Sequence, residues 1–379
     1  MPEKSMIGAY GDWAASLAPD PGTRSLRSQP DQDVDAWRAE TREYVSDRLA
    51  RPETGGTPVP RTERTYESDG LHVEELTWEL PYGPPTDAVF LRPANATGPL
   101  PGVLGLHDHG GQKYFGHRKI ADTDADIHPT IAEHREQCYG GRAWANELAK
   151  QGYAVLVHDA FAFASRRVRL ADVPTDLRDG TPEPRDDDPA SIDAYDAWAA
   201  AHESTMAKSL FAAGTTWPGV FLAEDQRALD VLCDREEVDD SHIGCAGLSG
   251  GGLRTVFLGG MDPRIDSAVC AGMMTTWRDY ARNKSATHTW MCYLPGCPSV
   301  LDYSEVLGLR VPAPTLVLNN HSDPLFTHRG MERADEILSA VYDAAGTSEA
   351  YECRWYDGEH KFDREMQVTA FDWFEDTLS

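Results

Sequence analysis

The sequence predicts an α/β fold in which a mostly parallel central sheet carries helices on both faces. Short apolar runs bounded by glycine, such as residues 103–106 and 153–157, are typical of buried parallel strands. Helix-like segments alternate with these runs along most of the chain, which is the pattern of right-handed strand–helix–strand units. A serine between glycines at residues 247–251 follows one such run and precedes a helix-like segment.

Length and composition limit the number of domains and the kind of protein that the chain can form. The 379 residues suit one large domain with insertions or two small domains. No apolar run approaches the roughly 20 residues needed to cross a bilayer, and residues 1–20 lack the basic-then-apolar pattern of a signal peptide. Seven scattered cysteines favour reduced thiols over a disulfide framework. We therefore expect a cytoplasmic protein with no membrane partner.

The charge balance is strongly acidic. The formal net charge is -27 at pH 7, and only seven of the 35 basic residues are lysines. Nucleic acid is an unfavourable partner for such a surface, because its binding requires cationic contacts to phosphate. Two interpretations of the acidity stay open. The protein works in high salt, where the Debye length falls to about 3 Å, or it comes from a mesophile with a GC-rich genome, which also prefers arginine.

Residues 1–60 are predicted to be a partly helical N-terminal extension, and residues 61–379 the main domain. A helix is expected from residue 31 to residue 49, before prolines and glycines break the chain. In the main domain, alternating or continuous apolar residues indicate strands, and apolar residues three or four apart indicate helices. The predicted strands are residues 71–80, 88–91, 103–106, 153–157, 242–246, 267–271, 315–319 and 351–356, and the predicted helices are residues 142–150, 217–232, 253–258, 331–341 and 367–378.

Two long insertions interrupt the alternation, at residues 165–216 and 273–310. The first combines a loop rich in Asp, Pro and Gly with a predicted helix over residues 192–211. Simple connections have about 4–6 residues, so these segments are too long to be plain loops. We interpret the first as a lid or cap over the site. An interface between copies of the chain in a homo-oligomer is the alternative that stays open for both.

The serine motif at residues 247–251 (Gly-Leu-Ser-Gly-Gly) has a mechanical interpretation. A strand that turns sharply into a helix holds the serine at an exposed, strained elbow, and the residues two positions away must lack a Cβ for the turn to close. Gly247 and Gly251 meet this demand. The motif alone is a weak signal, because an ordinary glycine-rich helix start has the same composition.

Ser249 needs an imidazole base, and the base needs a carboxylate that fixes its tautomer. In such a sheet these groups follow later strands in the order nucleophile, acid, histidine. Asp323 follows the strand at 315–319, and His360 follows the strand at 351–356. We therefore predict a triad of Ser249, Asp323 and His360. The competing residues are Asp357 as the acid and His321 and His328 as bases.

The turn at residues 107–111 (His-Asp-His-Gly-Gly) follows an early strand. In a hydrolase sheet this loop donates one backbone N–H to the oxyanion hole, and the residue after the nucleophile donates the other. We assign the N–H groups of Gly250 and His109, with Gly110 the alternative to His109. His107 and His109 also have a spacing found in metal sites, and His107 could be a buried hydrogen-bonding residue instead.

The pocket and cofactor predictions rest on fewer residues. A Gly-x-Gly-x-x-Gly motif is absent after the first strands, so a dinucleotide site has little support and no cofactor is expected. Trp277, Trp290 and Phe326, with Tyr293 nearby, are candidates for substrate contacts. An equally good interpretation makes these aromatic residues part of the core under the insertions.

Together these motifs resemble the α/β-hydrolase superfamily, and within it the dienelactone-hydrolase-like and acetyl-xylan-esterase-like branch. The likeness covers about residues 70–379 and rests on residues 107–111, 159–161, 247–251 and 358–360. It implies the α/β-hydrolase fold with Ser249 as nucleophile, Asp323 as acid and His360 as base. The chain departs from true dienelactone hydrolases, whose nucleophile is a cysteine.

The function expected from this set is hydrolysis of carboxylic esters, on small acyl or acetylated carbohydrate substrates, through an acyl-enzyme. A peptidase or a C–C bond hydrolase on the same triad is the enzymatic alternative. A non-catalytic binding module built on a hydrolase scaffold is another alternative, and a metal hydrolase using His107 and His109 is the last. The expected partner is a small-molecule ester.

Overall fold

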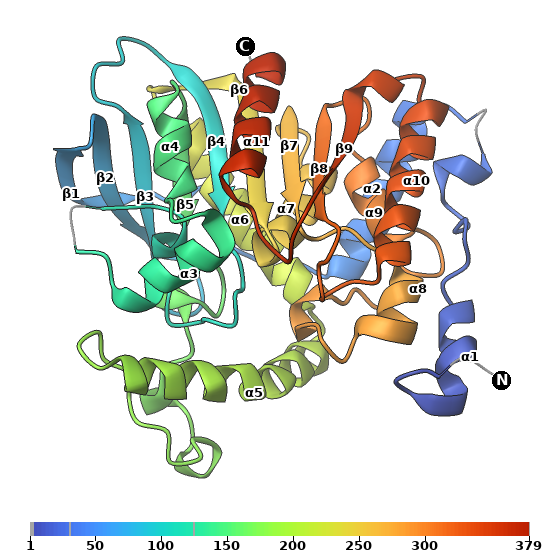
Figure 1. The fold of residues 1–379 in the computed structure, drawn as a ribbon, viewed down its shortest axis with the longest axis horizontal. Helices are drawn as coiled ribbons and strands as arrows, with labels where there is room; N and C mark the ends of the chain where they lie inside the picture. Colours follow the sequence, from blue (N-terminus) through green and yellow to red (C-terminus); the bar gives the residue numbers. More distant parts are fainter. Residues whose placement is uncertain (1–3, 30–31, 124–125, 379) are drawn as a thin grey trace.

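The computed structural model describes residues 4–29, 32–123 and 126–378. In this part of the chain nine strands form one sheet in the order β1-β2-β3-β5-β4-β6-β7-β8-β9 (Figure 1). The strands are β1 (Arg61–Ser68), β2 (Leu71–Trp78), β3 (Thr86–Pro93), β4 (Leu100–Leu106), β5 (Ala154–His158), β6 (Val238–Leu248), β7 (Ser267–Ala271), β8 (Thr315–Asn320) and β9 (Tyr351–Tyr356).

The sheet is antiparallel at one end and parallel over the rest. β1, β2, β3 and β5 pair antiparallel to one another. From β5 through β4, β6, β7 and β8 to β9 every pairing is parallel. Parallel strands end at the same edge of a sheet, so the loops after β4, β6, β7, β8 and β9 meet at one edge. The predicted site residues lie on these loops.

Eleven α-helices surround the sheet in the described part of the chain. They are α1 (Gly11–Ser16), α2 (Val34–Leu49), α3 (Pro129–Tyr139), α4 (Trp144–Lys150), α5 (Pro189–Ala213), α6 (Trp217–Cys233), α7 (Gly250–Met261), α8 (Trp277–Asp279), α9 (Tyr303–Gly308), α10 (His328–Ala344) and α11 (Arg364–Thr377). The segment at residues 112–141, for which the sequence patterns predict no helix, contains α3. Residue 31, where the first predicted helix begins, lies outside the described residues.

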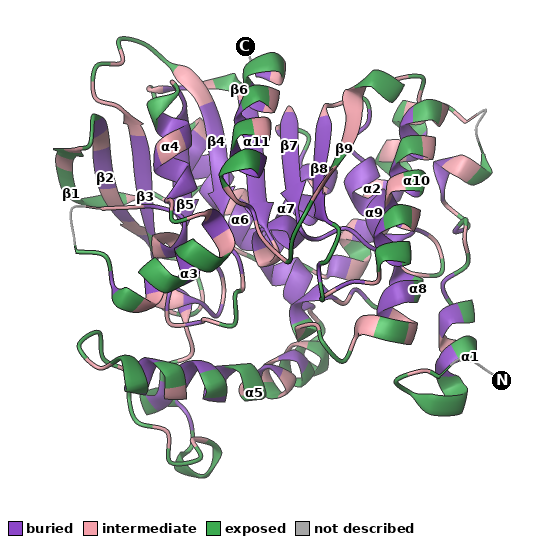
Figure 2. Ribbon diagram, in the orientation of Figure 1, coloured by how far each residue is buried: buried purple, intermediate pink, exposed green. Residues whose placement is uncertain are grey.

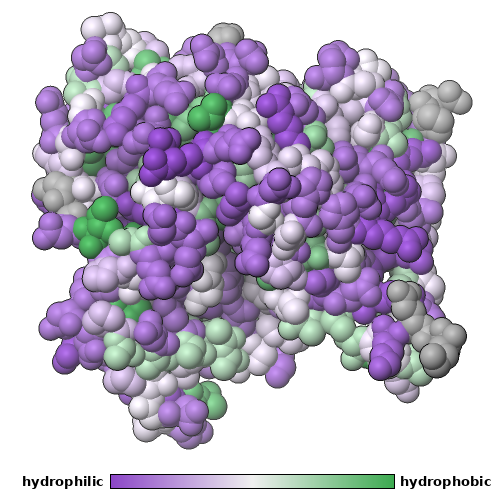
Figure 3. Space-filling model, in the orientation of Figure 1, coloured by the Kyte–Doolittle hydropathy of each residue, from purple (hydrophilic) through white to green (hydrophobic). Residues whose placement is uncertain are grey.

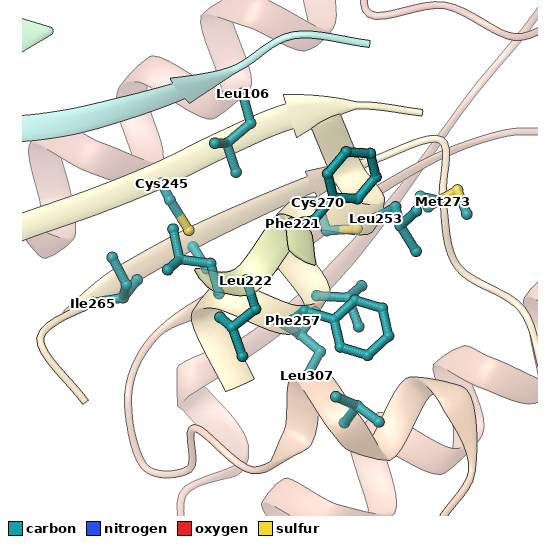
Figure 4. Packing of buried hydrophobic residues seen from close by; sticks show 14 of the residues in the cluster. Leu106, Phe221, Leu222, Cys245, Leu253, Phe257, Ile265, Cys270, Met273 and Leu307 are labelled. Atoms are coloured by element: carbon teal, nitrogen blue, oxygen red, sulfur yellow. The ribbon is translucent and has the colours of Figure 1, made fainter. Parts of the chain in front are cut away.

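Two hydrophobic cores lie on the two faces of the sheet. Alternate residues of each strand face opposite sides, so Leu104 and Cys245 join one core while Val103 and Ala246 join the other. Helices α2, α6, α7, α9 and α10 cover the first core, and α4 and α11 cover the second. Figure 2 shows the sheet buried between these layers, and Figure 4 shows the packing of α6, α7 and α9 on the first face.

The described part of residues 1–60 packs on the first face. Trp37, Val45 and Leu49 of α2 belong to that core. Thr216 Oγ1 donates a 2.8 Å hydrogen bond to the carbonyl of Leu49, and Arg42 Nε donates one of 2.8 Å to the carbonyl of Gly260. These bonds fix α2 to the start of α6 and to the end of α7.

The first insertion places the 25-residue helix α5 along the edge of the sheet where the parallel strands end (Figure 1). Its inner face contacts the short helix Trp290–Cys292 of the second insertion. Figure 3 shows a mostly hydrophilic surface, with apolar side chains gathered along α5. None of the helices in residues 4–29, 32–123 and 126–378 is long and apolar enough to span a membrane.

Candidate active site

Ser249 occupies a strained turn between β6 and α7. Its backbone has φ 56° and ψ -116°, a left-handed region that non-glycine residues seldom adopt. Its N–H donates a 3.0 Å bond to the carbonyl of Ala271 on β7. A Cβ on Gly251 would lie 2.0 Å from the carbonyl oxygen of Leu106, and one on Gly247 would lie 2.5 Å from the backbone of Gly251. Both positions therefore require glycine.

Asp323 and His360 are hydrogen-bonded to each other. His360 Nδ1 lies 2.6 Å from Asp323 Oδ2, and the carboxylate is fully buried. Asp323 Oδ1 accepts a second bond, of 2.9 Å, from the N–H of Leu325. The carboxylate thus fixes Nδ1 of His360 as a donor and leaves Nε2 as the basic nitrogen.

Backbone bonds between the two loops hold this pair together. The pairing of β8 with β9 continues past the strand ends, where the N–H of His321 donates to Tyr356 and the N–H of Ser322 donates to Gly358. The N–H of Lys361 also donates a 3.2 Å bond to Asn320 Oδ1. The position of the acid relative to the base therefore follows from the register of two adjacent strands.

His360 lies beside the elbow. A Cβ on Gly272 would meet His360 Cε1 at 3.0 Å, so the ring packs on the residue that follows Ala271, the hydrogen-bond partner of Ser249. His360 Nε2 is buried and has no hydrogen-bond partner among the described residues. Catalytic contacts are often loose without substrate and tighten in the complex. The imidazole of His360 therefore lies next to the turn that carries Ser249.

The competing residues face solvent. His321 and His328 are exposed, lie 3.3 Å apart between Nδ1 and Nε2, and stack on Trp355. Asp357 is exposed as well. The structure therefore joins Asp323 to His360 and leaves the alternative acid and bases outside this contact.

The loop after β4 lies against the start of α7. A Cβ on Gly250 would stand 2.6 Å from the backbone nitrogen of His109, so the two N–H groups assigned to the oxyanion hole come from adjacent residues in space. This arrangement can stabilise negative charge that develops on an acyl oxygen beside Ser249.

Both imidazoles of this loop are neutral and fully engaged. The N–H of Ala160 donates to His107 Nε2, so His107 Nδ1 donates to the carbonyl of Asp108. The N–H of Gly111 donates to His109 Nδ1. Burial, followed by the charge of Lys113, lowers the pKa of His109 to about 4. With these lone pairs occupied, His107 and His109 have none to offer a metal ion.

Glu203 of α5, in the first insertion, contacts both the loop after β4 (residues 107–111, called the oxyanion loop) and the second insertion. It is not among the site residues predicted from the sequence. Its carboxylate is buried and accepts bonds from His109 Nε2 at 2.6 Å and from Lys113 Nζ at 2.5 Å. It also accepts bonds from Thr289 Oγ1 at 2.6 Å and the N–H of Trp290 at 3.2 Å. Burial alone would raise the pKa of Glu203, but His109 and Lys113 hold that pKa below its usual value.

A signal for Glu203 does exist in the sequence. The buried positions Ala199, Glu203 and Ala207 recur four residues apart on α5, so the acid falls on the apolar stripe of the helix. A charged residue on such a stripe indicates a buried ionic partner.

The three aromatic candidates lie in different surroundings. Trp277 is buried and packs edge-to-face on Tyr303, with ring centroids 5.2 Å apart. Phe326 is buried against His288, with centroids 4.8 Å apart. Trp290 is 39% exposed and is tied to Glu203 through its backbone. Trp290 is thus the candidate with a ring surface free to touch a ligand.

Comparison with known proteins finds a relative of similar sequence and solved structures of similar fold. No protein-family model matches it. A protein of Bacillus subtilis (strain 168) named "Putative hydrolase YtaP" is 26% identical over 293 residues, which are 76% of this chain and 83% of the relative.

Solved structures share its architecture. A protein described as a "putative acetyl xylan esterase" from Bacteroides fragilis NCTC 9343 has a TM-score of 0.64 at 16% identity, over 93% of this chain and 83% of that one. A glucuronoyl esterase from Solibacter usitatus has a TM-score of 0.60 at 15% identity, over 91% and 93% of the two chains. At such low identity these likenesses establish the fold.

Proposed function

The chain has the α/β-hydrolase fold, and on that scaffold we propose that it is a serine hydrolase that cleaves carboxylic esters. The observation that carries this proposal is the hydrogen bond between His360 Nδ1 and Asp323 Oδ2, beside the strained elbow of Ser249. The kinship with a protein named as a hydrolase supports it.

The reaction has two steps on this geometry. His360 Nε2 takes the proton of Ser249 as the hydroxyl attacks the ester carbonyl, and the oxyanion forms against the N–H groups of Gly250 and His109. His360 then gives the proton to the leaving alcohol. Water releases the acid from Ser249 by the same steps in reverse, with His360 again acting as the base.

We propose small acyl esters or acetylated carbohydrate esters as substrates. The structural neighbours include proteins described as acetyl xylan and glucuronoyl esterases, which supports a carbohydrate ester. In this proposal residues 165–216 and 273–310 form the cap of the main domain, and Glu203 joins the two segments over the site. A net charge of -27 favours such neutral small molecules over nucleic acid.

Replacing the nucleophile tests this proposal. Ser249→Ala should lower kcat for p-nitrophenyl acetate by about 10⁶-fold, the scale of a serine triad, and should abolish labelling by a fluorophosphonate. Ser241→Ala is the matched control, because it removes an exposed serine of the same strand. Near-normal esterase activity in Ser249→Ala would refute the assignment. Faster turnover of peptides or of diketones than of esters would favour the alternative hydrolases.

A further inference from the structure

Lys119 is a fully buried lysine below the oxyanion loop. It ends the short helix His117–Lys119 and has 0% exposure. Its Nζ donates two hydrogen bonds to backbone carbonyls, at 3.0 Å to Asp108 and at 2.8 Å to His109. A buried ammonium directed at two consecutive carbonyls is unusual, because charged side chains seldom enter the protein interior.

The two carbonyls belong to the peptide groups that carry the candidate oxyanion donors. A trans peptide is planar, and its N–H points opposite to its C=O. The carbonyl of Asp108 shares a peptide with the N–H of His109, and the carbonyl of His109 shares one with the N–H of Gly110. Because Lys119 holds both carbonyls on its own side, both N–H groups point away from it.

A second donor and a packed surface strengthen this orientation. His107 Nδ1 also donates to the carbonyl of Asp108, at 3.0 Å. On the other side of the loop, the backbone nitrogen of His109 lies beside Gly250. The N–H of His109 is therefore directed from the buried lysine toward the elbow.

Lys119 is itself held in place by α3. The Asp108 carboxylate lies 3.7 Å from its Nζ and is fixed by Tyr139 Oη at 2.5 Å and His134 Nε2 at 3.1 Å. Arg135 Nε donates a 3.0 Å bond to the carbonyl of Lys119. These partners anchor both the ammonium group and its backbone, so the position of the charge is rigid.

We propose that Lys119 is a positioning residue of the oxyanion hole, which orients the N–H groups of His109 and Gly110 toward the substrate oxygen. Its positive charge also polarises both peptide groups, so their N–H groups bind a developing oxyanion more strongly than a neutral carbonyl. The inference rests on the proposed ester hydrolysis, in which Lys119 would act indirectly, by orienting backbone N–H groups.

Lys119→Met tests this role, with Arg310→Met as the matched control. Arg310 is likewise buried and donates to backbone carbonyls, those of Ala313 at 2.9 Å and Ile265 at 3.0 Å. Those carbonyls lie where β7 and β8 begin, at the edge of the sheet opposite to Ser249.

For p-nitrophenyl acetate, Lys119→Met should lower kcat by about 10²–10³-fold, the cost of an oxyanion donor, with KM within about threefold. The rate of fluorophosphonate labelling at Ser249 should fall in parallel. Arg310→Met should lower Tm but keep kcat within about threefold. A folded Lys119→Met protein with kcat within about threefold of wild type would overturn the inference, as would a change in KM alone.

Two further measurements complete the test. If the wild-type protein is labelled at Ser249 and hydrolyses esters, and Lys119→Met does both at nearly the same rates, only the inference fails. If the wild type does neither, the proposed function fails, and the inference fails with it. Should Lys119→Met not fold, a wild-type structure with a boronic acid on Ser249 decides. A boronate oxygen within about 3.2 Å of the His109 or Gly110 nitrogen supports the inference, and one bound elsewhere overturns it.

Discussion

The two sides of Ser249 are built in different ways. On the acid–base side, Asp323 and His360 sit on loops whose backbones continue the pairing of β8 with β9. On the oxyanion side, the loop after β4 is held by buried charged side chains, which include Lys119 shortly after the loop and Glu203 of the distant helix α5. The first side takes its geometry from strand register, and the second takes it from buried electrostatics.

This difference predicts different responses to mutation. A change on the acid–base side removes a reacting group while the strands that position it remain, so activity falls and stability changes little. A change on the oxyanion side leaves a buried charge without its partner, which costs stability as well as activity.

Asp323→Asn should give the largest effect of the variants that leave the nucleophile in place. The amide cannot fix His360 in the tautomer that accepts the serine proton, so kcat for p-nitrophenyl acetate should fall by about 10⁴-fold. Tm should change by only a few degrees. Asp357→Asn is the control, and its kcat should match wild type; a larger loss in Asp357→Asn than in Asp323→Asn would exchange the roles of the two acids.

Glu203→Gln should show the behaviour of the other side. Removing this charge leaves Lys113 buried without a carboxylate, a change that costs about 3–5 kcal/mol of unfolding free energy in buried ion pairs. The oxyanion loop should loosen with it and kcat/KM should fall. Urea unfolding and ester kinetics measure both effects, with Asp193→Asn, an exposed acid on the same helix, as the control. Unchanged unfolding free energy would show that the buried cluster does not hold the loop.

His109 should make the oxyanion side sensitive to acid. Its pKa in the folded protein is about 4, below the usual 6.5, so between these values the unfolded chain binds a proton that the folded protein does not. Stability contributed by this group is therefore complete above about pH 6.5 and is lost as pH falls toward 4, by up to about 3 kcal/mol.

The comparison of wild type with His109→Gln isolates this contribution. Unfolding free energies measured in urea at pH 7, 5.5 and 4 should fall more steeply for the wild type, because glutamine does not titrate. If the unfolding free energies of the two proteins fell equally with pH, protonation of His109 would not destabilise the folded protein.

Trp290→Ala should give the smallest effect. Its ring is partly exposed, so we expect a few-fold rise in KM for acetylated carbohydrate esters and an unchanged kcat for p-nitrophenyl acetate. Trp13→Ala removes an even more exposed ring on α1 and should leave both constants unchanged. An equal effect in the two variants would remove Trp290 from the substrate site.

The sequence by itself determined the fold, and it predicted Ser249, Asp323 and His360 as a triad, because the signals for both are local. These signals depend only on residues close together in the chain: short apolar runs, the glycines Gly247 and Gly251, and polar residues directly after strands. Asp323 and His360 each follow a parallel strand, and parallel strands end at the same edge of a sheet. Their position at one edge can therefore be predicted without knowledge of the tertiary structure. The sequence predicted Asp323 over Asp357 as the acid, and the structure added the hydrogen bond between Asp323 and His360 and the exposure of Asp357.

Only the tertiary structure decided which charged residues are buried and what they hold. Lysine and glutamate are surface residues in most sequences, so nothing local marks Lys119 as interior. The apolar stripe of α5 indicates that Glu203 is buried but does not identify its partners. Glu203 meets His109 across 94 positions in the chain, and Trp277 and Trp290, alike in sequence, differ in burial. Such pairings depend on how α3, α5 and the insertions pack together, and that packing is a sum of many long-range contacts that no short pattern records.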